Sequence, residues 1–355
     1  MKEKNKKVIV FLVMDDNFNG GPSVFSKMVV ESKLKEKYSF VLLFIPFKSK
    51  FVLDIKLILE MIKKIKKSKA DIVCFSGLQL EGFLSSVVSF LSGKKSIMFI
   101  HGSSEESFFF PFWKKKIIKI IEHISLTLVS QFVCISEYVN SWEKVRIHNK
   151  KNKGIIYNLY PDLPKKITFY QDKKFKLITT IGRLTKEKGY DNFIEIVKYF
   201  NIKKPEIKFV IVGEGEYKNY LSKVRNEYNL KNLFVIGYLK NVYKILSITD
   251  IYVSCSLHET FNRTLLEASI IGIPSIVNDV GGMREIVKHG ETGFLVKKNK
   301  IDTYIEKINF FLDNEDIRRN FGLKAKKYTQ TKFERDKILE KLNFLFSEKN
   351  ENQKN

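Results

Sequence analysis

The chain of 355 residues contains only three cysteines and no long apolar run. Cys74, Cys134 and Cys255 lie in or beside apolar segments, and their spacing suits no metal site. An odd number of buried cysteines fits a reducing compartment, so we expect a cytoplasmic protein. No uninterrupted apolar stretch reaches the roughly 18–20 residues of a membrane-spanning helix, so we expect no transmembrane segment.

The opening stretch, MKEKNKKVIVFLVMDDNF, has a basic start followed by apolar residues, as a signal peptide does. Its apolar part is only seven residues long and runs directly into two aspartates. We therefore predict a first buried strand over residues 8–14 rather than a targeting segment.

Acidic residues are scarce relative to basic ones: 39 Asp and Glu stand against 63 Lys and Arg, for a formal net charge of +24. Such a surface favours nucleotides, nucleic acid or anionic lipid as partners. The excess of lysine also fits a composition rich in Lys, Ile, Asn and Phe, which is typical of an AT-rich genome. No RNA- or DNA-reading motif is present, so we expect no nucleic-acid partner.

Short apolar runs alternate with longer amphipathic segments along the chain, which predicts parallel sheets covered by helices on both faces. Two prolines and several charges within residues 159–174 indicate a linker. The sequence therefore predicts an α/β protein with two doubly wound domains, residues 1–165 and 174–332. An amphipathic helix over 333–348 is expected to pack back toward the first domain. The predicted strands are 8–14, 40–45, 71–77, 96–102, 131–136, 176–184, 207–215, 233–239, 250–256 and 274–279.

Two loops of the first domain carry candidate site residues. In DDNFNGGPSVF, Gly20 and Gly21 precede a predicted helix, where they let the backbone approach an anion closely, although an ordinary strand-to-helix turn explains them equally well. In FIHGSS, His101 follows a buried strand and can donate to a ligand hydroxyl or act as an acid or base. The alternative is a histidine satisfied by nearby backbone.

The second domain opens with IGRLTKEKGYDNFIEI. Arg183 and Lys188 lie in the loop between a strand and a helix, and two cations beside a helix N-terminus suit a diphosphate. Solvated surface charge is the alternative.

The stretch HETFNRTLLEA holds two glutamates, Glu259 in a predicted loop and Glu267 in the second turn of a predicted helix. Because Glu259 lies outside the helix, both carboxylates can reach one ligand. A carboxylate accepts two hydroxyls, so a ribose diol suits one glutamate and a sugar diol suits the other. Taken alone, two glutamates at this distance mean little.

In this order, the motifs resemble those of the retaining, nucleotide-sugar-dependent glycosyltransferases of family 4. The resemblance spans essentially the whole chain and is strongest over residues 176–296, with GRLTKEKG, VGEG, GYL, HETFNRTLLEAS, GIPSIV and GGMREIVKHGETGFLV. It implies the GT-B fold, in which two Rossmann-like domains face a central cleft.

The resemblance also assigns roles to residues. It implies that His101 and Glu259 act at the reacting sugar, with Glu259 a positioning and electrostatic residue rather than a covalent nucleophile. It implies a donor-binding set from several loops: Gly20, Gly21, Arg183, Lys188, Glu259, Thr260, Phe261, Asn262 and Glu267.

Within this set, Arg183 and Lys188 match the pair on the donor diphosphate, and Glu267 matches the glutamate on the ribose hydroxyls. The backbone of residues 260–262 is expected to line the sugar and phosphate pocket. Glycines are common in the family at positions 260 and 262, where this chain has Thr260 and Asn262. This departure leaves the identity of the donor sugar open.

The resemblance implies a hexosyltransferase-type enzyme. The first candidate for its donor is a UDP-sugar, and the second is a GDP-sugar. The expected acceptor is a saccharide, in particular a lipid-linked one, in O-antigen or capsule-type polysaccharide synthesis. No Asp-x-Asp motif occurs at a matching loop and cations can stand in for a metal, so we expect metal-independent transfer with retention. A non-catalytic donor-binding partner subunit is the alternative, and an epimerase or phosphorylase of the same fold is another.

Two segments of the first domain, residues 53–69 and 108–129, are both basic and apolar. Aromatic residues beside lysines on an amphipathic helix suit a membrane interface. We expect docking on the anionic inner face of the cytoplasmic membrane. Alternatively, these helices pack their apolar sides on the sheet while the lysines face water.

Overall fold

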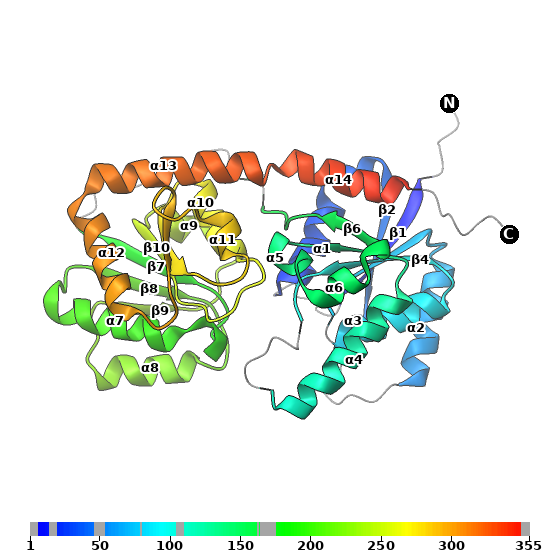
Figure 1. The fold of residues 1–355 in the computed structure, drawn as a ribbon, viewed down its shortest axis with the longest axis horizontal. Coiled ribbons are helices and arrows are strands. Elements are labelled where there is room, and N and C mark those ends of the chain that lie inside the picture. Colours follow the sequence, from blue (N-terminus) through cyan, green and yellow to red (C-terminus); the bar gives the residue numbers. More distant parts are fainter. Residues whose placement is uncertain are drawn as a thin grey trace. The chain divides into compact units, whose positions relative to one another are not determined.

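The computed structural model describes residues 6–13, 20–45, 54–78, 80–103, 110–161, 163 and 175–348. The chain divides into two compact units, one made of Met1–Leu159 with Arg335–Asn355 and the other of Tyr160–Glu334. Each unit contains a six-stranded sheet whose described strand pairs are parallel (Figure 1). The predicted α/β class with two parallel sheets is confirmed.

The first unit has the strand order β2-β1-β3-β4-β5-β6. Its strands are β1 (Lys7–Val13), β2 (Tyr38–Phe44), β3 (Ile72–Ser76), β4 (Lys95–Ile100), β5 (Gln131–Cys134) and β6 (Asn152–Ile155). Its helices are α1 (Gly21–Glu31), η1 (Lys33–Glu36), α2 (Ile55–Lys67), α3 (Leu80–Leu91), α4 (Phe112–Leu128), α5 (Glu137–Asn140), α6 (Glu143–Ile147), η2 (Asn149–Lys151) and α14 (Arg335–Ser347).

Strand β1 shows how the apolar runs build this unit. Side chains alternate along a strand, so Ile9, Phe11 and Val13 enter one core layer while the residues between them face the other side. Helix α14 adds five apolar side chains to the same layer, and the Tyr38 hydroxyl donates to the Asn343 carbonyl oxygen at 3.1 Å. The last described helix of the chain therefore completes the core of the first unit (Figure 1).

The second unit has the strand order β12-β11-β10-β7-β8-β9. Its strands are β7 (Leu177–Ile181), β8 (Lys208–Val212), β9 (Leu233–Ile236), β10 (Ile251–Ser254), β11 (Ser275–Asn278) and β12 (Gly293–Val296). Its helices are η3 (Lys186–Lys188), α7 (Tyr190–Lys203), α8 (Lys218–Glu227), α9 (Tyr243–Leu246), α10 (Arg263–Ile270), α11 (Met283–Ile286), α12 (Ile301–Asp313) and α13 (Glu315–Lys332).

The strand order of the second unit positions its loops. Strands β11, β10, β7 and β8 are neighbours in the sheet, and all of them run in the same direction. The loops that follow them therefore leave the same edge of the sheet, where ligands of doubly wound folds bind. This arrangement brings the loop with Lys188 next to the loop with Glu259.

Candidate functional site

The loop after β7 lies directly against the loop after β10. Gly189 has a φ of 67°, and a Cβ atom there would fall 2.0 Å from the carbonyl oxygen of Cys255. Beside this contact, the Leu257 amide donates to the Glu187 carbonyl oxygen at 2.8 Å. Only glycine permits both this backbone conformation and this close approach. The two loops are thus held together by backbone contacts.

A second glycine holds the loop that carries Glu259 from the other side. A Cβ atom on Gly282 would lie 2.1 Å from the Thr260 carbonyl oxygen. The Gly282 amide also donates to the Glu259 carbonyl oxygen at 3.0 Å. The backbone of Glu259 and Thr260 is therefore packed against the turn that begins α11.

The carboxylate of Glu259 is buried and receives three hydrogen bonds on a single oxygen. Oε1 accepts from Lys188 Nζ at 2.5 Å, from Ser256 Oγ at 3.1 Å and from Asn262 Nδ2 at 3.1 Å. Within the part of the chain that the structure describes, no hydrogen bond reaches Oε2. The three donors fix the orientation of the carboxylate and leave its second oxygen able to accept from a ligand.

Asn262 links this carboxylate to the start of helix α10. Its Oδ1 accepts from the Leu265 amide at 2.9 Å, while its Nδ2 donates to Glu259. From the sequence, only the backbone of Asn262 was expected in the pocket, and this role of its side chain was missed. The sequence does contain a signal for this role, because asparagine directly before a predicted helix is a favoured N-cap residue.

Glu267 lies one turn into α10, with 1% of its surface exposed. Its Oε1 forms an ion pair with Arg263 Nε at 3.2 Å. Burial raises the pKa of the Glu267 carboxyl, and Arg263 partly opposes that shift. The structure thus places both predicted glutamates in the same unit at buried positions, on either side of the Asn262 cap.

The two predicted diphosphate cations differ in their surroundings. Lys188 is largely buried, with its ammonium group against Glu259. The Arg183 side chain is 69% exposed, and its Nη2 meets Glu187 Oε1 at 3.2 Å. An exposed ion pair of this kind contributes little free energy, so little holds the Arg183 guanidinium in this position.

The aromatic residue between the glutamates anchors the loop. The ring of Phe261 is buried and meets the ring of Phe333 edge-on, with 5.5 Å between the centroids. The Phe261 side chain therefore packs into the second unit, and the prediction that it lines a pocket rests on its backbone alone.

The predicted residues of the first unit lie at the end of β4 and at the start of α1. His101 follows β4, is buried, and contacts the Phe25 ring edge-on at 5.3 Å between centroids. Burial lowers the pKa of His101 to about 3. Burial therefore favours the neutral imidazole, which can form hydrogen bonds.

Gly20 and Gly21 form the start of α1, and the Gly20 carbonyl oxygen accepts from the Val24 amide at 2.9 Å. Gly20 has an ordinary φ of −94°, and nothing lies within 4 Å of a Cβ atom built on Gly21. Neither backbone strain nor packing within the described residues requires glycine here.

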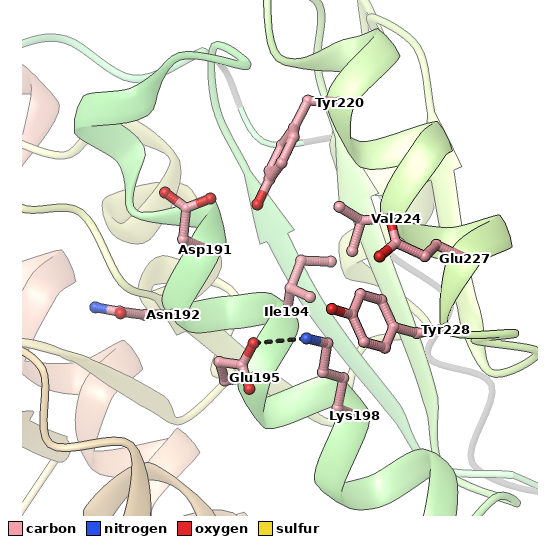
Figure 2. A pocket seen from close by; sticks show the side chains of 9 residues that line it. All are labelled: Asp191, Asn192, Ile194, Glu195, Lys198, Tyr220, Val224, Glu227 and Tyr228. Atoms are coloured by element: carbon pink, nitrogen blue, oxygen red, sulfur yellow. Dashed lines mark hydrogen bonds and ion pairs between the residues drawn. The ribbon is translucent and has the colours of Figure 1, made fainter.

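A cavity of about 370 Å³ lies between α7 and α8, and none of the predicted site residues lines it. Glu195 and Lys198, both on α7, form an ion pair at 2.8 Å in its lining (Figure 2). Three carboxylates against a single cation would repel a diphosphate, so this cavity does not suit an anionic donor. The lining residues are Asp191, Asn192, Ile194, Glu195, Lys198, Tyr220, Val224, Glu227 and Tyr228. In the described part of the chain, no three His, Cys, Asp or Glu side chains gather as a metal site.

Residues 164–328 match the model of a family described as "Glycosyl transferases group 1". The chain is 29% identical over 285 residues to the UDP-Gal:alpha-D-GlcNAc-diphosphoundecaprenol alpha-1,3-galactosyltransferase of Escherichia coli, covering 71% of this chain and 69% of that one. It is 25% identical over 330 residues to the capsular polysaccharide biosynthesis glycosyltransferase CapM of Staphylococcus aureus, covering 85% and 84% of the two chains.

Solved structures are similar over most or nearly all of the chain. Anabaena HepE, crystallised in complex with UDP and glucose, superposes with a TM-score of 0.78 at 14% identity, covering 96% of this chain and 99% of that one. A mutant of S. aureus TarM, in complex with Fondaparinux, alpha-GlcNAc-glycerol and UDP, superposes with a TM-score of 0.69 at 22% identity, covering 82% and 59%.

Proposed function

The chain is a group 1 glycosyltransferase with the GT-B fold, and from this premise we propose that it transfers a hexose from a nucleoside-diphosphate sugar to a saccharide acceptor. The observation that carries the proposal is the pair of buried carboxylates, Glu259 and Glu267, each with one oxygen that accepts no hydrogen bond from a described residue. A UDP-sugar is the first candidate donor because the name of the E. coli relative specifies UDP-Gal. A GDP-sugar is the second.

The reaction breaks the bond between the anomeric carbon and the diphosphate oxygen, so negative charge develops on the leaving diphosphate. Lys188, Arg183 and the N-terminus of α10 supply positive charge in the loops of the second unit. These groups can stabilise the leaving group without a metal ion. We therefore propose metal-independent transfer.

In the proposed transfer, the acceptor oxygen bonds to the anomeric carbon on the face that the diphosphate leaves. The acceptor proton passes to the departing diphosphate oxygen, and the configuration is retained. Glu259 is poorly suited to be a covalent nucleophile because Lys188, Ser256 and Asn262 all bind its Oε1. It instead orients a hydroxyl of the donor sugar through Oε2, and neutral His101 serves as a hydrogen-bonding residue.

An exposed apolar face on helix α4 supports the proposal that the acceptor is lipid-linked. Trp113, Ile117, Ile120 and Ile124 follow helical spacing, so they share one face, and all are exposed. The buried side of α4 is formed by Glu122, Ser125 and Leu126 instead. Packing on the sheet therefore does not account for the apolar stripe. The residues Phe108 and Phe109 that precede it lie outside the described residues.

Lysines flank this stripe and complete its amphipathic character. Lys116 Nζ lies 4.8 Å from the Phe112 ring centroid, and Lys114 Nζ lies 5.9 Å from that of Trp113. Apolar side chains that penetrate a headgroup layer beside lysines that meet anionic lipid are typical of a peripheral membrane helix. No described helix combines the length and the apolar character needed to cross a membrane. We propose peripheral docking on the inner face of the cytoplasmic membrane, in O-antigen or capsule-type synthesis.

The test is a donor screen with UDP-, GDP- and ADP-sugars, with and without a lipid-linked saccharide and with and without a chelator. We expect release of nucleoside diphosphate from one donor, dependence on the acceptor, no loss with the chelator, and an α-linked product from an α-linked donor by NMR. Nucleotide binding without release from any donor would instead favour a donor-binding partner subunit. Equal binding to anionic and neutral vesicles at low salt would contradict membrane docking.

A further inference from the structure

Arg263 is the first residue of helix α10, and Glu267 lies one turn later on the same face. Their ion pair joins Nε to Oε1, so the pair uses one nitrogen of the guanidinium and one oxygen of the carboxylate. Helix stability does not explain this arginine, because a cation in the first turn opposes the helix dipole.

Both members of the pair have a second polar atom that is buried and unused. Glu267 Oε2 and Arg263 Nη1 are buried and have no hydrogen-bond partner among the described residues. Buried polar atoms of native proteins are almost always hydrogen-bonded, so an unused donor and an unused acceptor on one ion pair indicate a ligand.

The two unused atoms define the chemistry of that ligand. Nη1 offers a proton and Oε2 offers a lone pair, and a hydroxyl group can satisfy both because it accepts one hydrogen bond and donates another. A phosphate oxygen would satisfy Nη1 but would be repelled by the carboxylate. An ammonium group would satisfy Oε2 but would be repelled by the guanidinium.

The start of α10 is fixed near the loops that carry the other predicted donor-binding residues. Thr264 Oγ1 donates to the Ile181 carbonyl oxygen at 2.9 Å, at the carboxyl end of β7. The loop with Arg183 and Lys188 follows directly. The Arg263–Glu267 pair therefore belongs to the same edge of the sheet as the candidate diphosphate cations.

We propose that Arg263 is a donor-binding and specificity residue, whose Nη1 donates to the same ribose hydroxyl that donates to Glu267 Oε2. This inference rests on the proposed use of a nucleoside-diphosphate sugar. The inference goes beyond the proposed function because it assigns Arg263 to recognition of the ribose rather than of the phosphates. The pair should therefore distinguish a ribonucleotide from the matching deoxyribonucleotide.

The experiment measures the affinity of UDP, 2′-deoxy-UDP and 3′-deoxy-UDP by calorimetry at about pH 8, where the Glu267 carboxyl is more fully ionised. For the unchanged protein, we expect one deoxy compound to bind roughly 10- to 100-fold more weakly than UDP, as for a lost hydrogen bond to charged groups. If GDP binds instead of UDP, GDP and its two deoxy analogues are used.

Arg263→Met and Arg263→Lys test the assignment. Met removes the guanidinium, and Lys keeps the positive charge beside Glu267 but lacks the planar fork of donors. In both variants we expect the preference for UDP over that deoxy compound to fall by roughly fivefold or more. Thermal unfolding of each variant shows whether the fold is intact. If the Arg263→Met variant does not fold, the Arg263→Lys variant alone serves as the test.

Each other outcome contradicts the inference in a recognisable way. If both variants bind UDP more weakly but keep the ribose preference, Arg263 acts on the phosphates and the hydroxyl assignment is wrong. If the Arg263→Lys variant keeps the full preference for UDP over the deoxy compound, Arg263 acts only by its charge. If the unchanged protein binds UDP and its deoxy analogues equally, the pair does not read the ribose. If it binds no nucleoside diphosphate at all, the proposed donor class fails and the inference fails with it.

Discussion

The loops of the second unit bury their polar side chains against one another, whereas helix α4 of the first unit turns its apolar side chains outward. In the second unit, Glu259 is buried and receives three hydrogen bonds, and the glycines beside it make backbone contacts that no other residue permits. On α4, Trp113 is 60% exposed and Ile120 is 61% exposed.

We propose that this difference corresponds to two kinds of recognition, a bound donor in the second unit and a lipid surface on α4. A small charged ligand with fixed geometry needs donors and acceptors at fixed positions, and burial fixes them. A fluid lipid surface has no fixed geometry, so it requires only apolar area and positive charge on one face of a helix. We therefore expect single substitutions to have large effects in the second unit and graded effects on α4.

The largest effect is expected from Lys188→Met. The change removes the cation beside Glu259 and one of the proposed charges on the leaving diphosphate. We expect kcat to fall by roughly 10²- to 10³-fold, as for loss of one preorganised charge-stabilising donor. Steady-state release of nucleoside diphosphate measures it.

Lys186→Met is the matched control, because Lys186 is exposed on the same turn. The control should leave kcat within about twofold of the unchanged protein. Equal losses in the two variants would mean that the general charge of the loop matters rather than the buried position of Lys188.

Gly189→Ala should have the next largest effect, on stability. The new Cβ atom combines a positive φ with a contact of 2.0 Å to the Cys255 carbonyl oxygen, so the two loops must separate. We expect a loss of roughly 2–4 kcal/mol in the free energy of unfolding of the second unit, together with loss of activity. Urea unfolding monitored by far-UV circular dichroism measures it.

Gly290→Ala separates the two causes. Gly290 also has a positive φ, of 76°, but no atom of the described residues lies within 4 Å of a Cβ atom placed on it. Its loss should be only about 1–2 kcal/mol, from the backbone conformation alone. Similar losses in both variants would show that the close approach of the two loops is unimportant.

The motifs in these buried loops are the part of the sequence from which the family and the fold were predicted. The family, the enzyme class and the GT-B fold are confirmed by the comparisons. They could be predicted because glycines and charges at fixed spacing after strands reflect local geometric needs. Two strands were missed, β6 and β12, which lie at sheet edges and have four residues each. Strand β6, with the sequence NKGI, is half polar and largely not buried, so it lacks the continuous apolar run that marks a central strand.

Side-chain partners were less predictable than loops. That Asn262 binds Glu259, and that Arg263 pairs with Glu267, depends on rotamers and packing at the start of α10 rather than on residue type. Likewise, the amphipathic sequence of α4 does not indicate which of its apolar side chains are exposed, whereas the structure exposes Trp113, Ile117, Ile120 and Ile124. The roles of the predicted site residues stay predictions until they are tested by substitution.

A smaller effect is expected on α4 from the double change Trp113→Ser and Ile117→Ser. It removes two exposed apolar side chains while the neighbouring lysines stay in place. We expect binding to vesicles that contain anionic lipid to weaken by roughly tenfold or more, because each buried side chain contributes about 1.5–3 kcal/mol and the stripe is only partly immersed. Vesicle sedimentation measures it.

Ile202→Ser is the control for this change, because Ile202 is an exposed apolar residue on α7 of the second unit. Vesicle binding should be unaffected by it. Release of nucleoside diphosphate to a soluble saccharide acceptor should be unchanged in the double variant. If that activity falls together with vesicle binding, the stripe contributes to the fold or to the site rather than to a membrane contact.

The smallest effect is the pH dependence that Glu267 gives to donor binding. Burial raises the pKa of this carboxyl above its ordinary value, so it takes up a proton at a pH where an exposed glutamate stays ionised. The protonated form loses its charge-assisted acceptor, so UDP affinity should fall by a few-fold as the pH falls through that raised pKa. Stability should change in the opposite direction, since a raised carboxyl pKa contributes stability that is present at low pH and is lost as the pH rises through it. Glu267→Gln should remove both dependences, which calorimetric titrations and thermal unfolding over the same pH series will measure. A UDP affinity with the same pH dependence in both proteins would mean that another group controls binding and that the buried carboxylate is not the acceptor.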